Sequence, residues 1–146
     1  MLFEESHSLC SINQKTIVSQ ENGRKHIAHN DHSCDVFQYR IDGDIIPPST
    51  GEARCDYIVE IDKSTKSQTK RSAYLIELKG TDLNHAIDQI EATLKMFSNK
   101  LREYDVFLRI VYRSNTHAVN SPKVMKFKKK YGDRQRIGTN VIEESI

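Results

Sequence analysis

Three residues able to carry out hydrolytic chemistry lie at the ends of two apolar runs, residues 56–62 and 73–80. Asp56 opens the first run, and Glu77 and Lys79 lie near the end of the second. If the runs pair symmetrically about the polar segment between them, Asp56 lies near Lys79, and a register shift of two residues leaves every side chain on the same face. Two carboxylates and an ammonium group are therefore expected at one end of a hairpin.

The two faces of this hairpin differ because successive side chains of a strand point to opposite sides. One face is apolar throughout and carries Tyr57, Val59, Ile61, Tyr74, Ile76 and Leu78. The other face mixes charged with apolar side chains and carries Asp56, Ile58, Glu60, Leu75, Glu77 and Lys79. An antiparallel hairpin with one face in water would show such charges without any function. The apolar neighbours instead indicate partial burial, and a partly buried carboxylate pair must be neutralised by a proton, a lysine or a cation.

A bound divalent cation would neutralise these carboxylates. Oxygen ligands of this kind suit Mg²⁺ or Mn²⁺. An adjacent lysine can orient or activate a water molecule and stabilise the charge that develops on a phosphate. The pattern therefore favours metal-assisted hydrolysis of a phosphate ester.

The same residues resemble the core of the PD-(D/E)XK nuclease superfamily, which has a restriction-endonuclease-like fold. In that pattern an Asp opens one strand, Glu-x-Lys ends the next strand after a hairpin, and a helix follows. Here the pattern is matched by Asp56, by Glu77-Leu78-Lys79 and by a helix that carries Ala86-Ile87-Asp88-Gln89. The resemblance covers about 40 residues, and its motif is short.

The resemblance implies a nuclease that hydrolyses phosphodiester bonds, with DNA favoured over RNA, in defence, restriction or repair. Asp56 and Glu77 would bind Mg²⁺, for which Mn²⁺ can substitute. Lys79 would position the attacking water, and Gln89 would orient the substrate or the lysine. Many relatives act with a partner or as dimers, so a homodimer or a protein partner is the expected source of specificity. Cys55 stands where the superfamily name has Pro.

Many relatives add an acidic residue from an N-terminal helix, and the sequence leaves the identity of this residue open. The candidates are Glu21, Asp35, Asp42, Asp44 and Glu52. None of them lies in a segment with helical periodicity. Loss of this ligand would favour the alternative function, a catalytically inactive nucleic-acid-binding or partner-docking module of the same fold.

Residues 121–132 are predicted to form a short basic helix, because Ser121-Pro122 is a good start and Gly132 a good stop. Between residues 123 and 136 there are seven basic residues and one acidic residue, a local excess of +6. The candidates for nucleic-acid binding are Lys123, Lys126, Lys128, Lys129, Lys130 and Arg134. A solvated basic face without a partner would show the same charge. Next to a phosphodiesterase-like pattern, the helix is expected to contact phosphates without reading bases.

Other functional signals are weaker. A group of His26, His29, His32 and Cys34 has side chains that Zn²⁺ prefers, but structural zinc sites usually pair ligands across two knuckles and no second one follows. A solvated His-rich loop near phosphate is the favoured interpretation. No P-loop, dinucleotide-binding loop or G-x-S-x-G elbow is present.

The order of elements predicts an α/β or α+β domain in which a mixed sheet with a central hairpin is flanked by helices. Strands are expected at residues 36–41 and 106–112, on either side of the hairpin in sequence. A helix is expected from Thr81-Asp82 to Leu101, because apolar residues recur every three or four positions. The first 35 residues carry no clear pattern.

Length and composition set the broad class. The chain has 146 residues with 22 Lys and Arg against 20 Asp and Glu, so the net charge is +2 and one domain spanning residues 1–146 is expected. No stretch approaches the roughly 18 apolar residues of a membrane span. The acidic start is unlike a signal peptide, so a soluble cytoplasmic protein is expected. Three cysteines without a CxxC pair argue against a disulfide framework.

Overall fold

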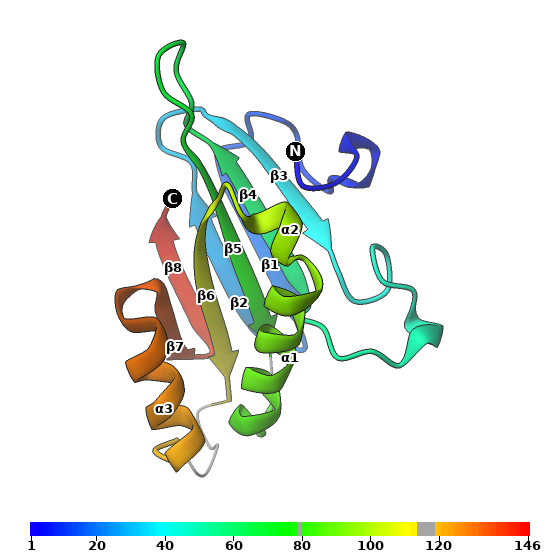
Figure 1. The fold of residues 1–146 in the computed structure, drawn as a ribbon, viewed down its shortest axis with the longest axis vertical. Coiled ribbons are helices and arrows are strands. Elements are labelled where there is room, and N and C mark those ends of the chain that lie inside the picture. The colour runs from blue at the N-terminus through cyan, green and yellow to red at the C-terminus, as the bar shows by residue number, and fades with distance from the viewer. Residues whose placement is uncertain (79, 114–118) are drawn as a thin grey trace.

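The computed structural model describes residues 1–78, 80–113 and 119–146 and shows an α+β fold with two mixed β-sheets (Figure 1). The larger sheet contains, in spatial order, β3 (Asp35–Arg40), β4 (Tyr57–Asp62), β5 (Arg71–Leu78), β6 (Asp105–Tyr112) and β7 (Gln135–Thr139). The smaller sheet contains β1 (Thr16–Glu21), β2 (Arg24–His29) and β8 (Val141–Ser145). The predicted α+β class with a mixed sheet and a central hairpin is confirmed, whereas the restriction-endonuclease-like form of this core stays a prediction.

The helices lie in the connections between the parallel strands of the larger sheet. They are α1 (Leu83–Met96), α2 (Ser98–Leu101) and α3 (Pro122–Tyr131). Single 3₁₀ turns are found before β1 (η1, Glu5–His7), between β3 and β4 (η2, Pro48–Thr50) and after α3 (η3, Gly132–Arg134). The side chains of Asp82 and Ser121 accept hydrogen bonds from the first turns of α1 and α3, as the sequence predicts. The predicted helix to Leu101 is interrupted at Phe97, whose backbone leaves helical geometry with φ −104° and ψ 20°. Among the described helices, none is long and apolar enough to cross a membrane.

The β4–β5 hairpin pairs two residues out of step with the symmetric register but keeps the predicted facing. Tyr57 lies opposite Ile76, and Asp62 lies opposite Arg71. Because the shift is an even number of residues, every side chain stays on its predicted face. The strands therefore extend further toward the tip, and the connection shortens to residues 63–70.

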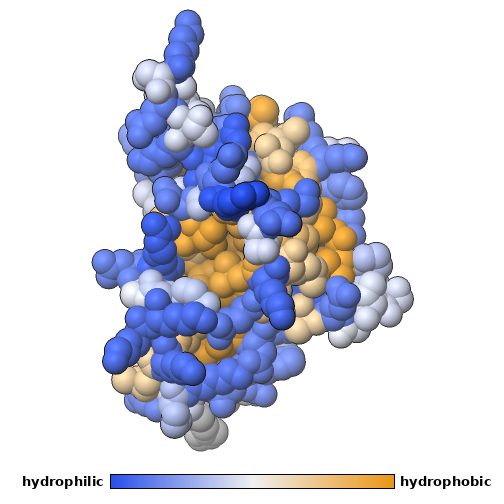
Figure 2. Space-filling model, in the orientation of Figure 1, coloured by the Kyte–Doolittle hydropathy of each residue, from blue (hydrophilic) through white to orange (hydrophobic). Residues whose placement is uncertain are grey.

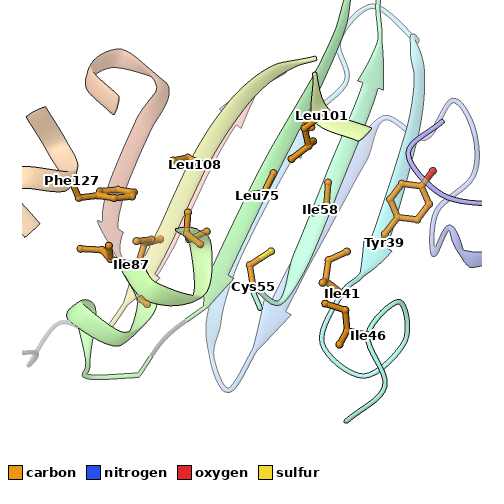
Figure 3. Close-up of a cluster of buried hydrophobic side chains, with 14 of the residues drawn as sticks. Tyr39, Ile41, Ile46, Cys55, Ile58, Leu75, Ile87, Leu101, Leu108 and Phe127 are labelled. Carbon is orange, nitrogen blue, oxygen red and sulfur yellow. The ribbon is translucent and has the colours of Figure 1, made fainter. Parts of the chain in front are cut away.

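Both faces of the larger sheet are covered. On one face Ile58, Leu75 and Leu108 pack against α1 and α3 (Figure 3). On the other face the predicted apolar residues of the hairpin pack against Ile17 and Ile142 of the smaller sheet. The hairpin face that carries the charges is thus helix-covered, and Glu60 on it is only 1% exposed. The Glu60 carboxylate accepts hydrogen bonds from the Leu2 N–H, the Tyr39 hydroxyl and the Tyr104 hydroxyl.

The smaller sheet was not predicted from the sequence. Its strands β1 and β2 form a hairpin within the first 35 residues, and β8 pairs in parallel with β2 although more than 110 residues separate them. Its buried positions include the polar side chains of Ser19 and His26, so apolar alternation is weak. His26 and His29, interpreted as part of a solvated His-rich loop, therefore lie in a strand that pairs with the adjacent β1 and with the distant β8.

A buried charge cluster joins the two sheets. The Arg109 guanidinium of β6 donates to both carboxylate oxygens of Glu144 in β8, at 2.7 and 2.9 Å. His26 Nε2 of β2 lies 2.7 Å from the same carboxylate. Burial raises the pKa of Glu144, but the hydrogen bonds to His26 and Arg109 outweigh burial and lower it to about 2. The charged cluster is therefore part of what holds β8 against the larger sheet.

Glu144→Gln is expected to destabilise the protein near neutral pH. The pKa of Glu144 falls from 4.5 to about 2 on folding, so its carboxylate stabilises the fold above about pH 4.5 and this stabilisation is lost as the pH falls toward 2. At 1.36 kcal/mol per pKa unit, the loss in the variant at pH 7 is about 3 kcal/mol. Urea unfolding at pH 7, 4 and 3 measures it. Glu143→Gln is the control, because its more exposed pair with His29 contributes little; equal effects of the two changes would contradict the role of the cluster.

Candidate active site

Helix α1 fixes the chain immediately before Asp56. The Arg54 N–H donates to Gln89 Oε1 at 3.0 Å, and the Cys55 N–H donates to Thr93 Oγ1 at 2.8 Å. The Thr93 hydroxyl in turn donates to the Gln89 carbonyl oxygen at 2.8 Å. Residues one helical turn apart on α1 therefore set the entry of the chain into β4, and with it the position of Asp56.

Asp56 lies at the end of the hairpin where β5 ends. Its Oδ2 accepts the Leu78 N–H at 2.8 Å, and its own N–H donates to the Ile76 carbonyl oxygen at 3.1 Å. Burial raises the pKa of Asp56, the Leu78 hydrogen bond lowers it, and repulsion from Glu21 raises it again, with a net value of about 6. A hydrogen bond with the Glu77 side chain is a smaller effect that lowers the pKa. This carboxyl group therefore holds a proton more tightly than an ordinary aspartate.

Glu77 is 2% exposed and lies beside Asp56. Burial first, and then the nearby charge of Glu77, raise the pKa of the Cys55 thiol. Glu77 belongs to the hairpin face that carries the predicted catalytic residues. The two carboxylates expected at one end of the hairpin are therefore close enough to interact directly.

Glu21 supplies a third carboxylate from the smaller sheet. It ends β1 before the turn at Asn22 and Gly23, which both have positive φ. Its side chain contacts Asp56, and within the described ranges its Oε2 is buried without a hydrogen-bond partner. Glu21 was one of five open candidates for the additional acidic ligand. It comes from a strand, so a search for an acidic residue on a helix does not single it out.

Arg24 brings a positive charge to the same end of the molecule. It faces Glu21 across the β1–β2 turn and is 5% exposed. Its Nε lies 3.4 Å from the Leu78 carbonyl oxygen, and its Nη1 is buried without a partner among the described residues. No local pattern in the sequence marks this residue, because only the packing of the smaller sheet brings it to the hairpin.

The other candidates for the additional ligand lie elsewhere. Asp42 pairs with Arg54 at 3.0 Å, and Asp44 pairs with His7 at 3.1 Å. Asp35 opens β3 opposite Asp62, at the other end of the hairpin, and Glu52 is exposed. Lys79 lies outside the described residues, so its predicted role stays a prediction. Gln89 holds the backbone of Arg54, and its predicted role toward substrate is untested.

The donor set fits a hard divalent cation. The site offers carboxylate oxygens, one of them a buried oxygen of Glu21 without a described partner, and these are the ligands that Mg²⁺ prefers. In the described geometry, however, no group of three or more His, Cys, Asp or Glu side chains is arranged to hold a metal ion. Asp56 Oδ2 instead accepts a backbone hydrogen bond, and Asp56 and Glu77 contact each other. Cation binding would therefore require these side chains to turn, and below about pH 6 it would compete with a bound proton.

The residues considered for zinc are not brought together. His26 is fully buried against Glu144, whereas His29 pairs with Glu143 at 2.6 Å. His32 and Cys34 lie in the connection to β3. In the described part of the chain, these four residues do not form a group that could hold a metal ion.

The predicted basic helix forms as α3, with Val124 and Phe127 turned into the core. Three of the six predicted phosphate ligands, five of which lie on α3 and one in η3, have acidic partners. Lys123 pairs with Asp88, Lys130 with Glu91 at 3.1 Å, and Arg134 with Asp105 at 3.5 Å. For Lys126, Lys128 and Lys129 the described part of the chain shows no ion pair. These three lysines are the ones that remain available to a polyanion.

Comparison of the chain with protein-family models, curated proteins and solved structures finds no match. The fold and the site of the chain itself therefore carry the functional argument. The fold is an α+β domain, and the site consists of three neighbouring carboxylates at one end of its central hairpin.

In metal-free protein, Asp56→Asn is expected to raise the free energy of unfolding above pH 6. Because folding raises the pKa of Asp56 from 3.8 to about 6, wild-type stability falls as the pH rises through this interval. The variant lacks this loss, and at 1.36 kcal/mol per pKa unit its gain at pH 7.5 is up to about 3 kcal/mol. Urea unfolding in EDTA at pH 4, 5.5 and 7.5 measures the difference, which should shrink toward pH 4.

The control for this experiment is Glu52→Gln, which removes an exposed carboxylate from the loop before Asp56. Its stability should follow that of the wild type at every pH. If Asp56→Asn also follows the wild type at pH 7.5, Asp56 is not a buried, destabilising charge.

Proposed function

We propose that this chain is a metal-dependent nuclease of the PD-(D/E)XK type that hydrolyses phosphodiester bonds, in DNA rather than RNA. The observation that carries the proposal is the meeting of Asp56, Glu77 and Glu21 where β5 ends. Desolvated carboxylates that destabilise one another are retained where a cation or a reaction requires them. The resemblance of Asp56 and Glu77-Leu78-Lys79 to the superfamily motif supports the same function.

Asp56 and Glu77 would hold Mg²⁺, or Mn²⁺ in its place, with Glu21 as the third ligand. When bound, the metal would supply a Lewis acid that stabilises charge on the phosphate and the leaving oxygen. Lys79 would position the attacking water, as the resemblance implies. Gln89 and Thr93 would act as positioning residues, because they fix the backbone that enters Asp56.

Helix α3 would hold the nucleic-acid backbone. Lys126, Lys128 and Lys129 would contact phosphates, since no acidic residue in the described ranges neutralises them. Ser121 Oγ donates to Asn84 Oδ1 at the start of α1, while Lys130 pairs with Glu91 two turns further on. Helix α3 therefore lies alongside α1 from Asn84 to Glu91, and its contacts would hold the backbone of the substrate. A homodimer or a protein partner would supply specificity in a cytoplasmic restriction, defence or repair role.

A catalytically inactive module that binds nucleic acid or a partner is the second candidate. It is favoured by the finding that the described carboxylates do not already form a three-ligand metal site. In that case a proton on Asp56, whose pKa is raised to about 6, would take the place of a cation below that pH.

Cleavage assays separate the two functions. Plasmid, single-stranded DNA and RNA are incubated with Mg²⁺, Mn²⁺ or EDTA, and the enzyme should cut only with metal. Asp56→Asn, Glu77→Gln and Lys79→Met should each lower the rate by about 100-fold or more, because each removes a ligand or a proton-handling group from the transition state.

Glu52→Gln is the matched carboxylate control and should cut at the wild-type rate. Cleavage that survives the changes at Asp56, Glu77 and Lys79 would reject the proposed site. Salt-sensitive binding without cleavage, weakened by neutralising Lys126, Lys128 and Lys129, would instead support the inactive module.

A further inference from the structure

The β4–β5 hairpin continues beyond the sheet as a projecting arm, formed by residues 63–70. Figure 1 shows this arm standing clear of the other elements at the top of the view. Figure 2 shows that the projecting surface is hydrophilic. Residues 64–70 are all exposed. The arm therefore contributes little to the core.

The arm nevertheless has a defined conformation. The Lys63 N–H donates to the Lys70 carbonyl oxygen at 2.8 Å, and the Thr65 N–H donates to the Gln68 carbonyl oxygen at 2.8 Å, which closes the tip. Ser64 Oγ accepts the Lys70 N–H at 2.9 Å. A segment ordered before binding loses less conformational entropy when a partner arrives.

The charge of the arm is positive and mostly unneutralised. Its bases are Lys63, Lys66 and Lys70, with Arg71 directly following, and residues 63–72 contain no acidic and no apolar side chain. Arg71 pairs with Asp62 at 3.3 Å. The three lysines have no ion pair with any described acidic residue. They therefore form a positive site that is available from solvent.

The chemistry of the arm selects phosphate as its ligand. Between the lysines lie only Ser, Thr and Gln side chains, which donate hydrogen bonds to phosphate oxygens. An arm without an aromatic or aliphatic anchor is poorly suited to a protein hot spot or to a bilayer interface. At its base the basic surface continues into a cleft of about 390 Å³ between the arm and the α2–β6 connection, where Arg102 joins Lys70 and Arg71. Glu103 and Asp105 also line this cleft.

We propose that the arm binds the phosphate backbone of a nucleic-acid duplex at a distance from the carboxylates. From residue 57 to residue 66 the strand and tip span about 30 Å at 3.3 Å per residue, which corresponds to about nine base pairs at 3.4 Å per step. The arm is thus a second phosphate contact, separate from α3. Its spacing from the reacting phosphate rests on the proposed nuclease function, but its binding of a duplex does not.

Salt-dependent binding of duplexes of two lengths tests this role. Fluorescence anisotropy with 24-base-pair and 8-base-pair DNA, in EDTA, compares wild type with the triple variant Lys63→Gln, Lys66→Gln, Lys70→Gln. With the 24-mer, the slope of log K against log salt should become shallower by about 2.7, because each lost phosphate contact removes about 0.9. The 8-mer is too short to reach both the arm and the rest of the molecule at once, so the wild-type slope should be shallower with the 8-mer than with the 24-mer.

The matched control removes three other exposed lysines, Lys15→Gln, Lys95→Gln and Lys100→Gln. If the slope becomes shallower by the same amount in the arm variant and in the control, the effect is one of net charge and the proposal is overturned. An unchanged slope of the arm variant with the 24-mer would also overturn it. Binding of phosphatidylserine vesicles that the arm variant loses, with unchanged DNA binding, would also overturn it. If the protein cleaves with metal but the arm variant leaves the slope unchanged, only the role of the arm is rejected. If duplex binding depends on the arm but the protein never cleaves, only the nuclease function is rejected.

Discussion

The register of the β4–β5 hairpin is the constraint on which the other features depend. Pairing Tyr57 with Ile76 places Asp56 beside the end of β5 and Glu77 on the helix-covered face. A slip of one residue would exchange the two faces, and the carboxylate of Glu77 would enter the apolar contact with the smaller sheet. The same pairing closes the hairpin at its other end, where it projects the basic arm. One set of backbone hydrogen bonds thus sets both the carboxylates and the proposed phosphate contact.

The smaller sheet completes the site at a cost in stability. It brings Glu21 to Asp56, and burial together with repulsion from Glu21 raises the pKa of Asp56 to about 6. Elsewhere the same sheet is held to the larger one by Glu144 between Arg109 and His26, a carboxylate whose pKa moves in the opposite direction. The Arg109 guanidinium and a hydrogen bond with His26 stabilise the Glu144 carboxylate, whereas Glu21 repels the carboxylate of Asp56. The contrast distinguishes a stabilising buried charge from one that a metal ion would relieve.

Patterns within single segments of the sequence predicted the β4–β5 hairpin and helix α1. The alternation in residues 56–62 and 73–80 predicted the facing of the hairpin, and the apolar stripe from Leu83 predicted α1, because both patterns come from one continuous segment. The smaller sheet was missed because β8 pairs with β2 across most of the chain and buries polar side chains such as His26. In the candidate site, the closeness of Asp56 and Glu77 follows from the hairpin. Glu21 could not be chosen among five acidic residues, since only tertiary packing brings it there.

Titration with Mn²⁺, followed by electron paramagnetic resonance, tests most directly whether Glu21, Asp56 and Glu77 share a cation. One Mn²⁺ per chain should bind, Mg²⁺ should displace it, and acidification through pH 6 should release it, because protons compete for the same oxygens. Binding should be lost in Asp56→Asn and Glu77→Gln and weakened in Glu21→Gln. A wild-type protein that binds no Mn²⁺, or binding that all three variants retain, would contradict the shared site.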